Sequence, residues 1–377
     1  MSAAGTAAVA APLDSAWWTL EIQATAQPMA NPAGGAAASA GSAQELDLAL
    51  TLGTAPATGQ VFRREIDRWQ LQLGASLYAG DADLAERLGA VFALQSTAQP
   101  QGLWLTRLAI ERRAAVGELG VSAGLQALDP TFLAMPAYGH FIHSAFNQTL
   151  NIAMAGMPVS PYAAPALVLT YRPTSQWCWR LGALAPQGDN PGGYPLFGAR
   201  ALQRSPLPSP AGGWLQIAQL ERSWPAADGR LKRSGARAAL PDGLLQLGGY
   251  GGRGSGSYAA ITLPVGLPLG LANRLWAAAS VGFDPATNPV PLYGQMGWLS
   301  QGVLPGRPAD VLALAFGRSS FSPALRQSYE AVLEANYHLA LGGGLSLQPA
   351  LQWIANPGGQ GRVPGILAAT VQVQLTY

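Results

Sequence analysis

Carboxylate, amide, imidazole and guanidinium groups recur at alternate positions along this sequence, in a mix suited to hydroxyl-rich solutes. Carboxylates accept hydrogen bonds from pairs of hydroxyl groups, while arginine donates a planar fork. The candidates for lining a shared wet surface are Glu21, Asp47, Arg68, Arg107, Glu111, Glu118, Arg180, Glu330, Glu334, Asn336, His338, Gln348 and Gln352. The alternative is that these charges pair with each other and only keep that surface hydrated.

The elements that would position these residues are β-strands, because the pattern has a period of two. The last residues, Ala369–Tyr377, alternate strictly between apolar side chains and Thr or Gln. Fifteen further segments follow the same rule, which makes sixteen. The segments are 18–25, 45–52, 68–78, 103–112, 116–126, 166–171, 177–184, 213–220, 244–250, 258–265, 273–283, 292–300, 311–317, 328–339, 344–354 and 366–377.

Composition agrees with an all-β protein. The chain has 377 residues, of which 46 are Gly and 30 are Pro, so it has little room for long helices. Only 11% of the residues are charged and the formal net charge is +2, which does not indicate a nucleic-acid partner. The single cysteine, Cys178, cannot form an internal disulfide. Nothing in the sequence calls for a cofactor or a metal.

Sixteen strands with Leu-rich faces and few charges favour a membrane barrel over a water-soluble sandwich. In hydrocarbon, strands satisfy their backbone hydrogen bonds only in a closed sheet. Aromatic residues on the apolar faces are typical of the girdles at both membrane interfaces. They are Trp18, Trp69, Trp104, Trp177, Trp179, Tyr337, Trp353 and Tyr377. We therefore expect a closed antiparallel transmembrane β-barrel of about 16 strands.

The gaps between segments predict the orientation and the loops. The gaps 26–44, 79–102, 127–165, 185–212 and 355–365 are long, whereas 113–115, 172–176 and 340–343 are short. Long extracellular loops that alternate with short periplasmic turns are typical of outer-membrane barrels. We expect residues 17–377 to form the barrel and residues 1–16 to be a tail or a signal-peptide remnant. The loops 79–102 and 127–165 are candidates for folding into the lumen as constrictions, and 79–102 could contain a short helix.

Several other motifs lack the context that their chemistry needs. The segment Gly249–Gly254 matches G-x-G-x-x-G, but no helix follows, so we interpret it as a strand end and a glycine loop. His140 and His143 have no third ligand, which favours a packing role in a loop. Asn147 begins a glycosylation sequon by pattern only.

An enzyme barrel is a competing class, because His338 and Ser346 could face each other across a glycine turn. Both would point into the lumen, away from lipid substrates, so we predict no enzymatic activity. A purely structural or adhesive barrel is a third class, which would show no conductance.

Two segments carry a family resemblance. Residues 348–359 read "QPALQWIANPGG", and residues 302–310 read "GVLPGRPAD" with Arg307, Pro308 and Asp310 in a turn. Both segments resemble motifs of the carbohydrate-selective porin family, the OprB family. One departure is Ala350, where the family usually has an acid. The resemblance spans nearly the whole chain, but its specific part is the last ninety or so residues.

The resemblance implies a sixteen-stranded passive channel in the outer membrane of a Gram-negative-type bacterium. It implies diffusion of small sugars and similar solutes, with monosaccharides as the expected class. The alternative is a general or inorganic-ion porin of the same fold. Expected partners are outer-membrane lipid, the small solutes and the outer-membrane assembly machinery, which would act on the C-terminal strand ending at Tyr377. A homotrimer is compatible with the porin class.

Overall fold

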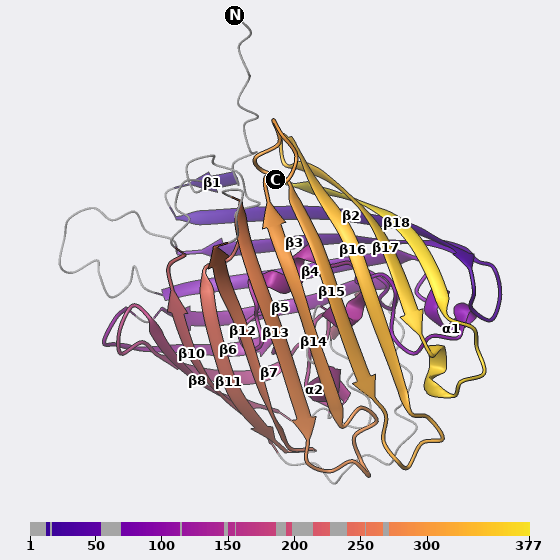
Figure 1. Cartoon of the computed structure of the whole chain (residues 1–377). Helices are drawn as coiled ribbons and strands as arrows, with labels where there is room; N and C mark the ends of the chain where they lie inside the picture. Colours follow the sequence, from indigo (N-terminus) through magenta and orange to yellow (C-terminus); the bar gives the residue numbers. More distant parts are fainter. Residues whose placement is uncertain are drawn as a thin grey trace, which may run out of the picture.

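The last strand of the chain pairs with one of the first, and this pairing closes the sheet into a barrel (Figure 1). The computed structural model describes residues 13–15, 17–53, 69–113, 115–146, 150–154, 156–185, 194–197, 214–226, 240–252, 254–266 and 271–377. Sixteen antiparallel strands form the wall of the barrel. They are β2 (Trp18–Ala33), β3 (Ala40–Leu52), β4 (Trp69–Gly80), β5 (Gly102–Arg112), β6 (Leu119–Gln126), β7 (Ala164–Tyr171), β8 (Trp177–Leu184), β10 (Leu215–Trp224), β11 (Gly243–Gly251), β12 (Gly256–Gly266), β13 (Ala272–Gly282), β14 (Leu292–Gln301), β15 (Val311–Ser320), β16 (Tyr329–Gly342), β17 (Leu345–Ala355) and β18 (Ile366–Thr376).

Two short strands add to this wall. β1 (Leu13–Ser15) pairs with β2, and β9 (Tyr194–Phe197) pairs with β5 beyond the point where β6 ends. Each of the sixteen predicted segments corresponds to one long strand, so the predicted fold class and strand number are confirmed. Among the described residues, no helix has both the length and the apolarity needed to cross a membrane.

The two rims of the barrel differ. One rim, here called the turn end, carries the 343–344 turn and the C-terminus (Figure 1), and Tyr377 exchanges backbone hydrogen bonds with Ile22 there. The opposite rim, the loop end, carries the loops that follow β4 and β6. The gap predicted at 26–44 is shorter than expected, because β2 and β3 extend until only residues 34–39 connect them. Asn31 stabilises this tight loop by donating to Gly34 and accepting from Ser39.

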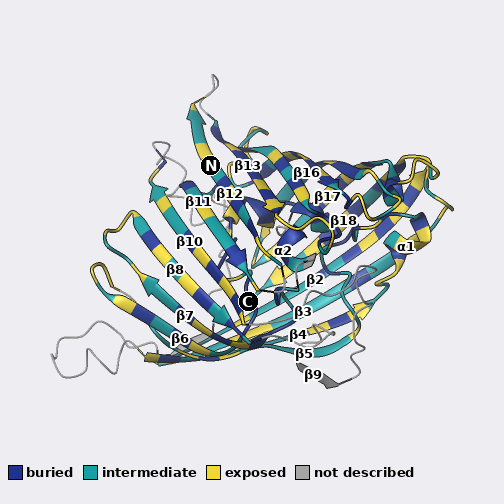
Figure 2. Cartoon of the chain, turned by 90° about the horizontal axis from the view of Figure 1, so that it is seen from below, coloured by how far each residue is buried: buried dark blue, intermediate teal, exposed yellow. Residues whose placement is uncertain are grey.

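Side chains alternate between the two faces of every long strand, and Figure 2 shows this as bands of buried and exposed residues. On β17, for example, Leu351 and Trp353 are exposed and point outward, whereas Gln352 and Ile354 are buried and point inward. The outward face is apolar along most of its height. The inward face carries the amides and carboxylates.

One bulge reverses this alternation within β5. Gly74 of β4 is paired with Arg107, but the next residue, Ala75, is paired with Leu105, so Thr106 is an extra residue on β5. An extra residue shifts every following side chain to the other face of the strand. Trp104 therefore points inward, as do Arg107 and Glu111 on the other side of the bulge. The prediction that Trp104 lies in a membrane girdle is wrong for this reason.

The long loops fold into the barrel, and Figure 2 shows α2 within the ring of strands. The 81–101 loop contains α1 (Leu84–Leu88), which confirms the predicted short helix, and Gly89 ends it with φ 83°. The 127–163 loop contains the 3-10 helices η2 (Pro136–His140) and η3 (Ser144–Phe146) and the helix α2 (Leu150–Met154). Phe141 and Phe146 of this loop pack against Trp276 of β13 with ring centroids 5.4 and 6.3 Å apart.

Candidate functional site: the lumen and its loops

Glu330 on the inward face of β16 binds two loops at once. Its carboxylate accepts hydrogen bonds from the backbone N–H groups of Val91 (2.9 Å) and Phe92 (3.2 Å) in the 81–101 loop. It also accepts one from Gly358 (2.8 Å), in the loop between β17 and β18. Because an ionised acceptor makes the stronger hydrogen bonds, this buried carboxylate fixes both loops to the wall.

Glu334, four residues further along β16 and on the same face, binds the second in-folded loop. It accepts from the backbone N–H groups of Ile142 (2.9 Å) and His143 (2.8 Å). The side-chain amides of Asn336 and Gln352 also donate to it, at 2.8 and 3.1 Å. The carboxylate is thus fully enclosed by donors and lies beneath the loop, away from open water.

The amides around Glu334 complete the attachment of these loops. Asn336 and Gln348 both donate to the carbonyl oxygen of His140, at 2.9 and 2.8 Å. Gln352 donates to the carbonyl oxygen of Leu94, at 3.0 Å, so it contacts the 81–101 loop as well. The predicted polar face of β16 and β17 therefore points inward, where it binds loop backbone.

His143 of the 127–163 loop is buried and His140 is half-buried. Burial lowers the pKa of His143 to about 3. Burial, with the neighbouring His338 as a second cause, lowers the pKa of His140 to about 4. The backbone of both residues is engaged by β16 and β17, which confirms the packing role predicted for this pair. Protonating either ring places an extra charge inside a dry contact.

Paired charges lie on the wall formed by β5, β8 and β10. Arg180 of β8 contacts Glu221 of β10 at 2.7 Å, and Gln246 donates to the same carboxylate at 3.2 Å. On β5, Arg107 lies 3.7 Å from Glu111, which also accepts from Gln72 at 2.7 Å. These four charged side chains keep partial access to water, unlike the glutamates of β16.

The remaining predicted candidates lie in several places. Glu21 and Asp47 point inward on β2 and β3. Glu118 lies in the turn before β6, 4.0 Å from Arg112. His338 is inward, and its Nδ1 has no hydrogen-bond partner among the described residues. Arg68 lies outside the described residues, as does Asn147.

Sequence reasoning missed Glu221, although it has the same period-two signal. The predicted segment ended at Leu220, one residue too early, whereas β10 continues to Trp224. It also missed Glu45 and Ser76, which share the inward face with Asp47. Glu221 escaped because it lies outside its predicted segment, whereas Glu45 and Ser76 lie inside theirs and were not singled out.

Seven of the eight predicted girdle aromatics lie on the outward face. Trp353 is 50% exposed there, and Trp179 packs edge-on against Tyr171 with centroids 6.1 Å apart. The outward set is Trp18, Trp69, Trp177, Trp179, Tyr337, Trp353 and Tyr377. Trp104 is the exception: it is fully buried, and its ring meets Tyr162 of the 127–163 loop at 5.2 Å.

The other sequence motifs have structural roles. Arg307 and Asp310 form a two-pronged ion pair, at 2.7 and 3.0 Å, in the turn before β15, and this contact raises the pKa of Arg307. Asp310 also accepts from the backbone of Ala340 at 3.0 Å, which ties the turn to β16. Gly249 lies within β11, as predicted for the glycine-rich segment. Ser346 is paired with Ala340, so it does not face His338 directly.

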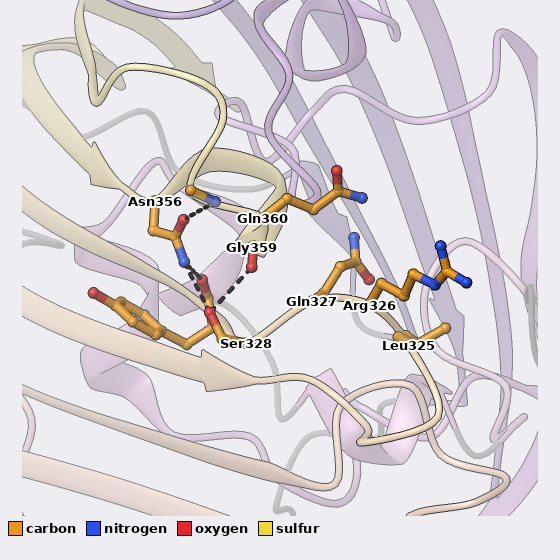
Figure 3. Close-up of a pocket in the computed structure, with 9 residues that line it drawn as sticks. Leu325, Arg326, Gln327, Ser328, Asn356, Gly359 and Gln360 are labelled. Carbon is orange, nitrogen blue, oxygen red and sulfur yellow. Dashed lines mark hydrogen bonds between the residues drawn. The ribbon is translucent and has the colours of Figure 1, made fainter.

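At the loop end, an open polar pocket of about 630 Å³ lies between the β15–β16 and β17–β18 loops (Figure 3). Asn356 connects the two loops: its amide donates to Ser328 and to the carbonyl of Tyr329, and its oxygen accepts from Gly361. Gln327, Gln360 and Arg326 surround the opening. Solutes approaching from this rim first meet hydrogen-bonding groups.

Comparisons with known proteins agree with this geometry. Residues 79–223 and 273–377 match the model of the carbohydrate-selective porin, OprB family. The structure is similar to the high-pH structure of Pseudomonas putida OprB, with a TM-score of 0.79 and 18% identity over 96% of this chain and 94% of that one. For the low-pH structure of the same protein, the TM-score is 0.60 and the identity 14%, over 96% and 93%.

A mutant of Rh. blastica porin shares the fold more loosely, with a TM-score of 0.51 and 10% identity over 96% of this chain and 100% of that one. No match was found among the curated proteins. The family model covers about two thirds of the chain, including both in-folded loops and the strand that binds them. The chain therefore belongs to the OprB family of carbohydrate-selective porins, and it is an outer-membrane channel rather than an enzyme.

Proposed function

We propose that this porin passes monosaccharides and solutes of similar size, and excludes larger oligosaccharides. The observation that carries the proposal is that two loops fold into the lumen and are fixed to Glu330 and Glu334 by four backbone N–H groups, those of Val91, Phe92, Ile142 and His143. A loop fixed in this way narrows the barrel permanently, because its attachment does not depend on a solute.

We further propose that solutes travel along the β5, β8 and β10 wall. The charged pairs Arg107–Glu111 and Arg180–Glu221 keep partial access to water, while the β16 side is filled by loop residues. Alternating donors and acceptors on that wall suit successive sugar hydroxyls, and each contact is weak enough for release. The other inward candidates, Glu21 and Asp47 among them, belong to the same proposed lining.

Planar-bilayer recordings test the solute class. Added glucose should reduce ion current through single channels, because sugar occupying the constriction displaces mobile ions. Maltohexaose applied to the loop end at equal weight concentration should reduce the ion current less than glucose does. A current that is indifferent to glucose would favour the alternative, a general or inorganic-ion porin.

Two partners belong to the same proposal. The outer-membrane assembly machinery would act on β18, whose terminal Tyr377 is exposed on the outward face and pairs with Ile22 only after closure. A homotrimer is supported by a hollow of about 320 Å³ on the outward face of β18, β2, β3 and β4. Cross-linking in native outer membrane tests the trimer, since a monomer would yield one band.

A further inference from the structure

An acidic pair lies on the inward face of β3. Glu45 and Asp47 are separated by one residue, so both point to the same side of the strand. Ser76 of β4 donates to the Asp47 carboxylate, and Tyr78 of the same strand lies in hydrogen-bond contact with Glu45. The two carboxyl groups also contact each other. The pair is therefore held in place by neighbouring side chains while it keeps partial access to the lumen.

This pair differs from Glu111 and Glu221 in lacking a cation. Glu111 has Arg107, and Glu221 has Arg180. In the described part of the chain, no basic side chain forms an ion pair with Glu45 or Asp47, and the charge that acts on Glu45 is that of Asp47. Two adjacent, half-buried carboxylates repel each other when both are ionised, and a positive charge between them removes that repulsion.

Unpartnered hydroxyl groups point into the same region. Thr25 lies directly opposite Glu45 on the neighbouring strand and on the same face. Its side chain is 6% exposed, and its hydroxyl has no hydrogen-bond partner in the described structure. The hydroxyl of Tyr162, 4% exposed, is likewise unpartnered, and its ring packs with Tyr78 and Trp104. Buried hydroxyl groups usually have a hydrogen-bond partner, so these two groups keep hydrogen-bonding capacity for a further group at this site.

We infer that Glu45 and Asp47, with the hydroxyl groups of Thr25 and Ser76, bind a hard divalent cation such as Ca²⁺. Ca²⁺ prefers carboxylate and other oxygen ligands and completes its shell with water. A cation supplies the missing positive charge and a partner for the Thr25 hydroxyl. It also strengthens the wall against which Tyr162 holds the 127–163 loop. The inference does not depend on which solute the channel passes.

Terbium luminescence tests this site in the refolded, full-length protein in detergent. Tb³⁺ takes the same oxygen ligands as Ca²⁺ and emits when a nearby aromatic ring is excited, and Tyr78, Tyr162 and Trp104 surround this pair. We expect sensitised emission that added Ca²⁺ quenches by competition. Glu45→Gln or Asp47→Asn should each weaken Tb³⁺ binding by about tenfold or more.

The matched control is Glu221→Gln, an inward glutamate that already has an arginine, and it should leave the emission unchanged. Thr25→Val keeps the shape of the side chain and should weaken binding without unfolding the barrel, which heat-modifiable migration on a gel verifies. Wild-type protein without sensitised emission would overturn the inference, as would equal emission from Glu45→Gln. A protonated-carboxyl infrared band that persists in excess Ca²⁺ would show instead that the pair shares a proton.

Discussion

The carboxylate of Glu334 accepts a hydrogen bond from the backbone N–H of His143 at 2.8 Å, and this contact joins a wall strand to a loop 191 positions earlier in the chain. The donor is a backbone group, so the identity of the side chain at position 143 does not determine the contact. The acceptor does determine it, because few other groups could accept from Ile142, His143, Asn336 and Gln352 together. Loop position therefore depends on β16, together with the hydrogen bonds that Gln219 and Tyr293 make to Leu133 and Ala145.

Glu334→Gln should release the 127–163 loop while the barrel stays closed. The amide is nearly isosteric, but it has one acceptor oxygen in place of two and no charge. Hydrogen bonds to charged groups contribute about 1.5–3 kcal/mol each, so losing even one loosens the loop. Single-channel recordings should show higher or noisier conductance than wild type. Glu118→Gln, in a turn at the rim, is the control; equal conductance in both variants would contradict the attachment.

Lowering the pH should also loosen this loop. The imidazoles of His143 and His140 have pKa values near 3 and 4 in the folded protein, against an ordinary value of about 6.5. A base whose pKa is lower in the folded state stays neutral there, while the unfolded state takes up a proton. The stability that it contributes is thus complete above pH about 6.5 and declines as the pH falls toward 3–4.

The protection factors of the 136–146 backbone amides, which are the ratios of intrinsic to observed exchange rate, should therefore fall between pH 7 and pH 4.5. Glu334 accepts from the backbone of His143, and His338 lies beside the His140 ring, where its protonation acts in the same direction as that of His140. The variant that replaces both histidines by glutamine should lose most of this dependence. Unchanged protection down to pH 4.5 in wild type would contradict buried, neutral imidazoles.

Trp104→Ala should destabilise the protein far more than Trp353→Ala. Trp104 is buried inside the barrel against Tyr162, and truncating a buried tryptophan costs about 3–5 kcal/mol. Trp353 is half exposed toward lipid, so lipid or detergent replaces its contacts. Urea unfolding in detergent micelles measures the free energy of unfolding of both variants. If the two variants lost equal stability, the inward orientation of Trp104, and with it the bulge at Thr106, would be incorrect.

Neutralising the acids of the open wall should change ion selectivity. Glu111→Gln with Glu221→Gln leaves Arg107 and Arg180 uncompensated, so reversal potentials in a KCl gradient should shift toward anions. Neutralising Glu330, which lies beneath a loop, should shift selectivity less. The opposite ranking would place the conduction path along β16.

The strands were predictable because a period of two shows directly in the sequence, and β16 to β18 follow it without interruption. The bulge in β5 was not predictable from the sequence. Thr106 resembles any other strand residue, and only the pairing of β5 with β4 shows that it is an extra residue. The length of β2 was underestimated because Pro28 and Pro32 interrupt its outward face. Pro32 is tolerated because it lies where the pairing of β2 with β18 shifts register, between Ala30 and Ala33.

The inward direction of Glu330 and Glu334 was also predictable, but their role was not. A period-two pattern gives the face on which a carboxylate lies, whereas its partners here are backbone N–H groups of Val91 and Ile142, which carry no sequence signal. For the same reason, the sequence does not distinguish a carboxylate that lines water from one that holds a loop.

Liposome swelling tests the central claim most directly. Vesicles containing the purified protein should swell rapidly in isotonic glucose and much more slowly in isotonic maltohexaose, while protein-free vesicles should respond to neither. Release of the loop in Glu334→Gln should reduce the difference between the two sugars. Equal swelling rates in both sugars for the wild-type protein would contradict a lumen narrowed by fixed loops.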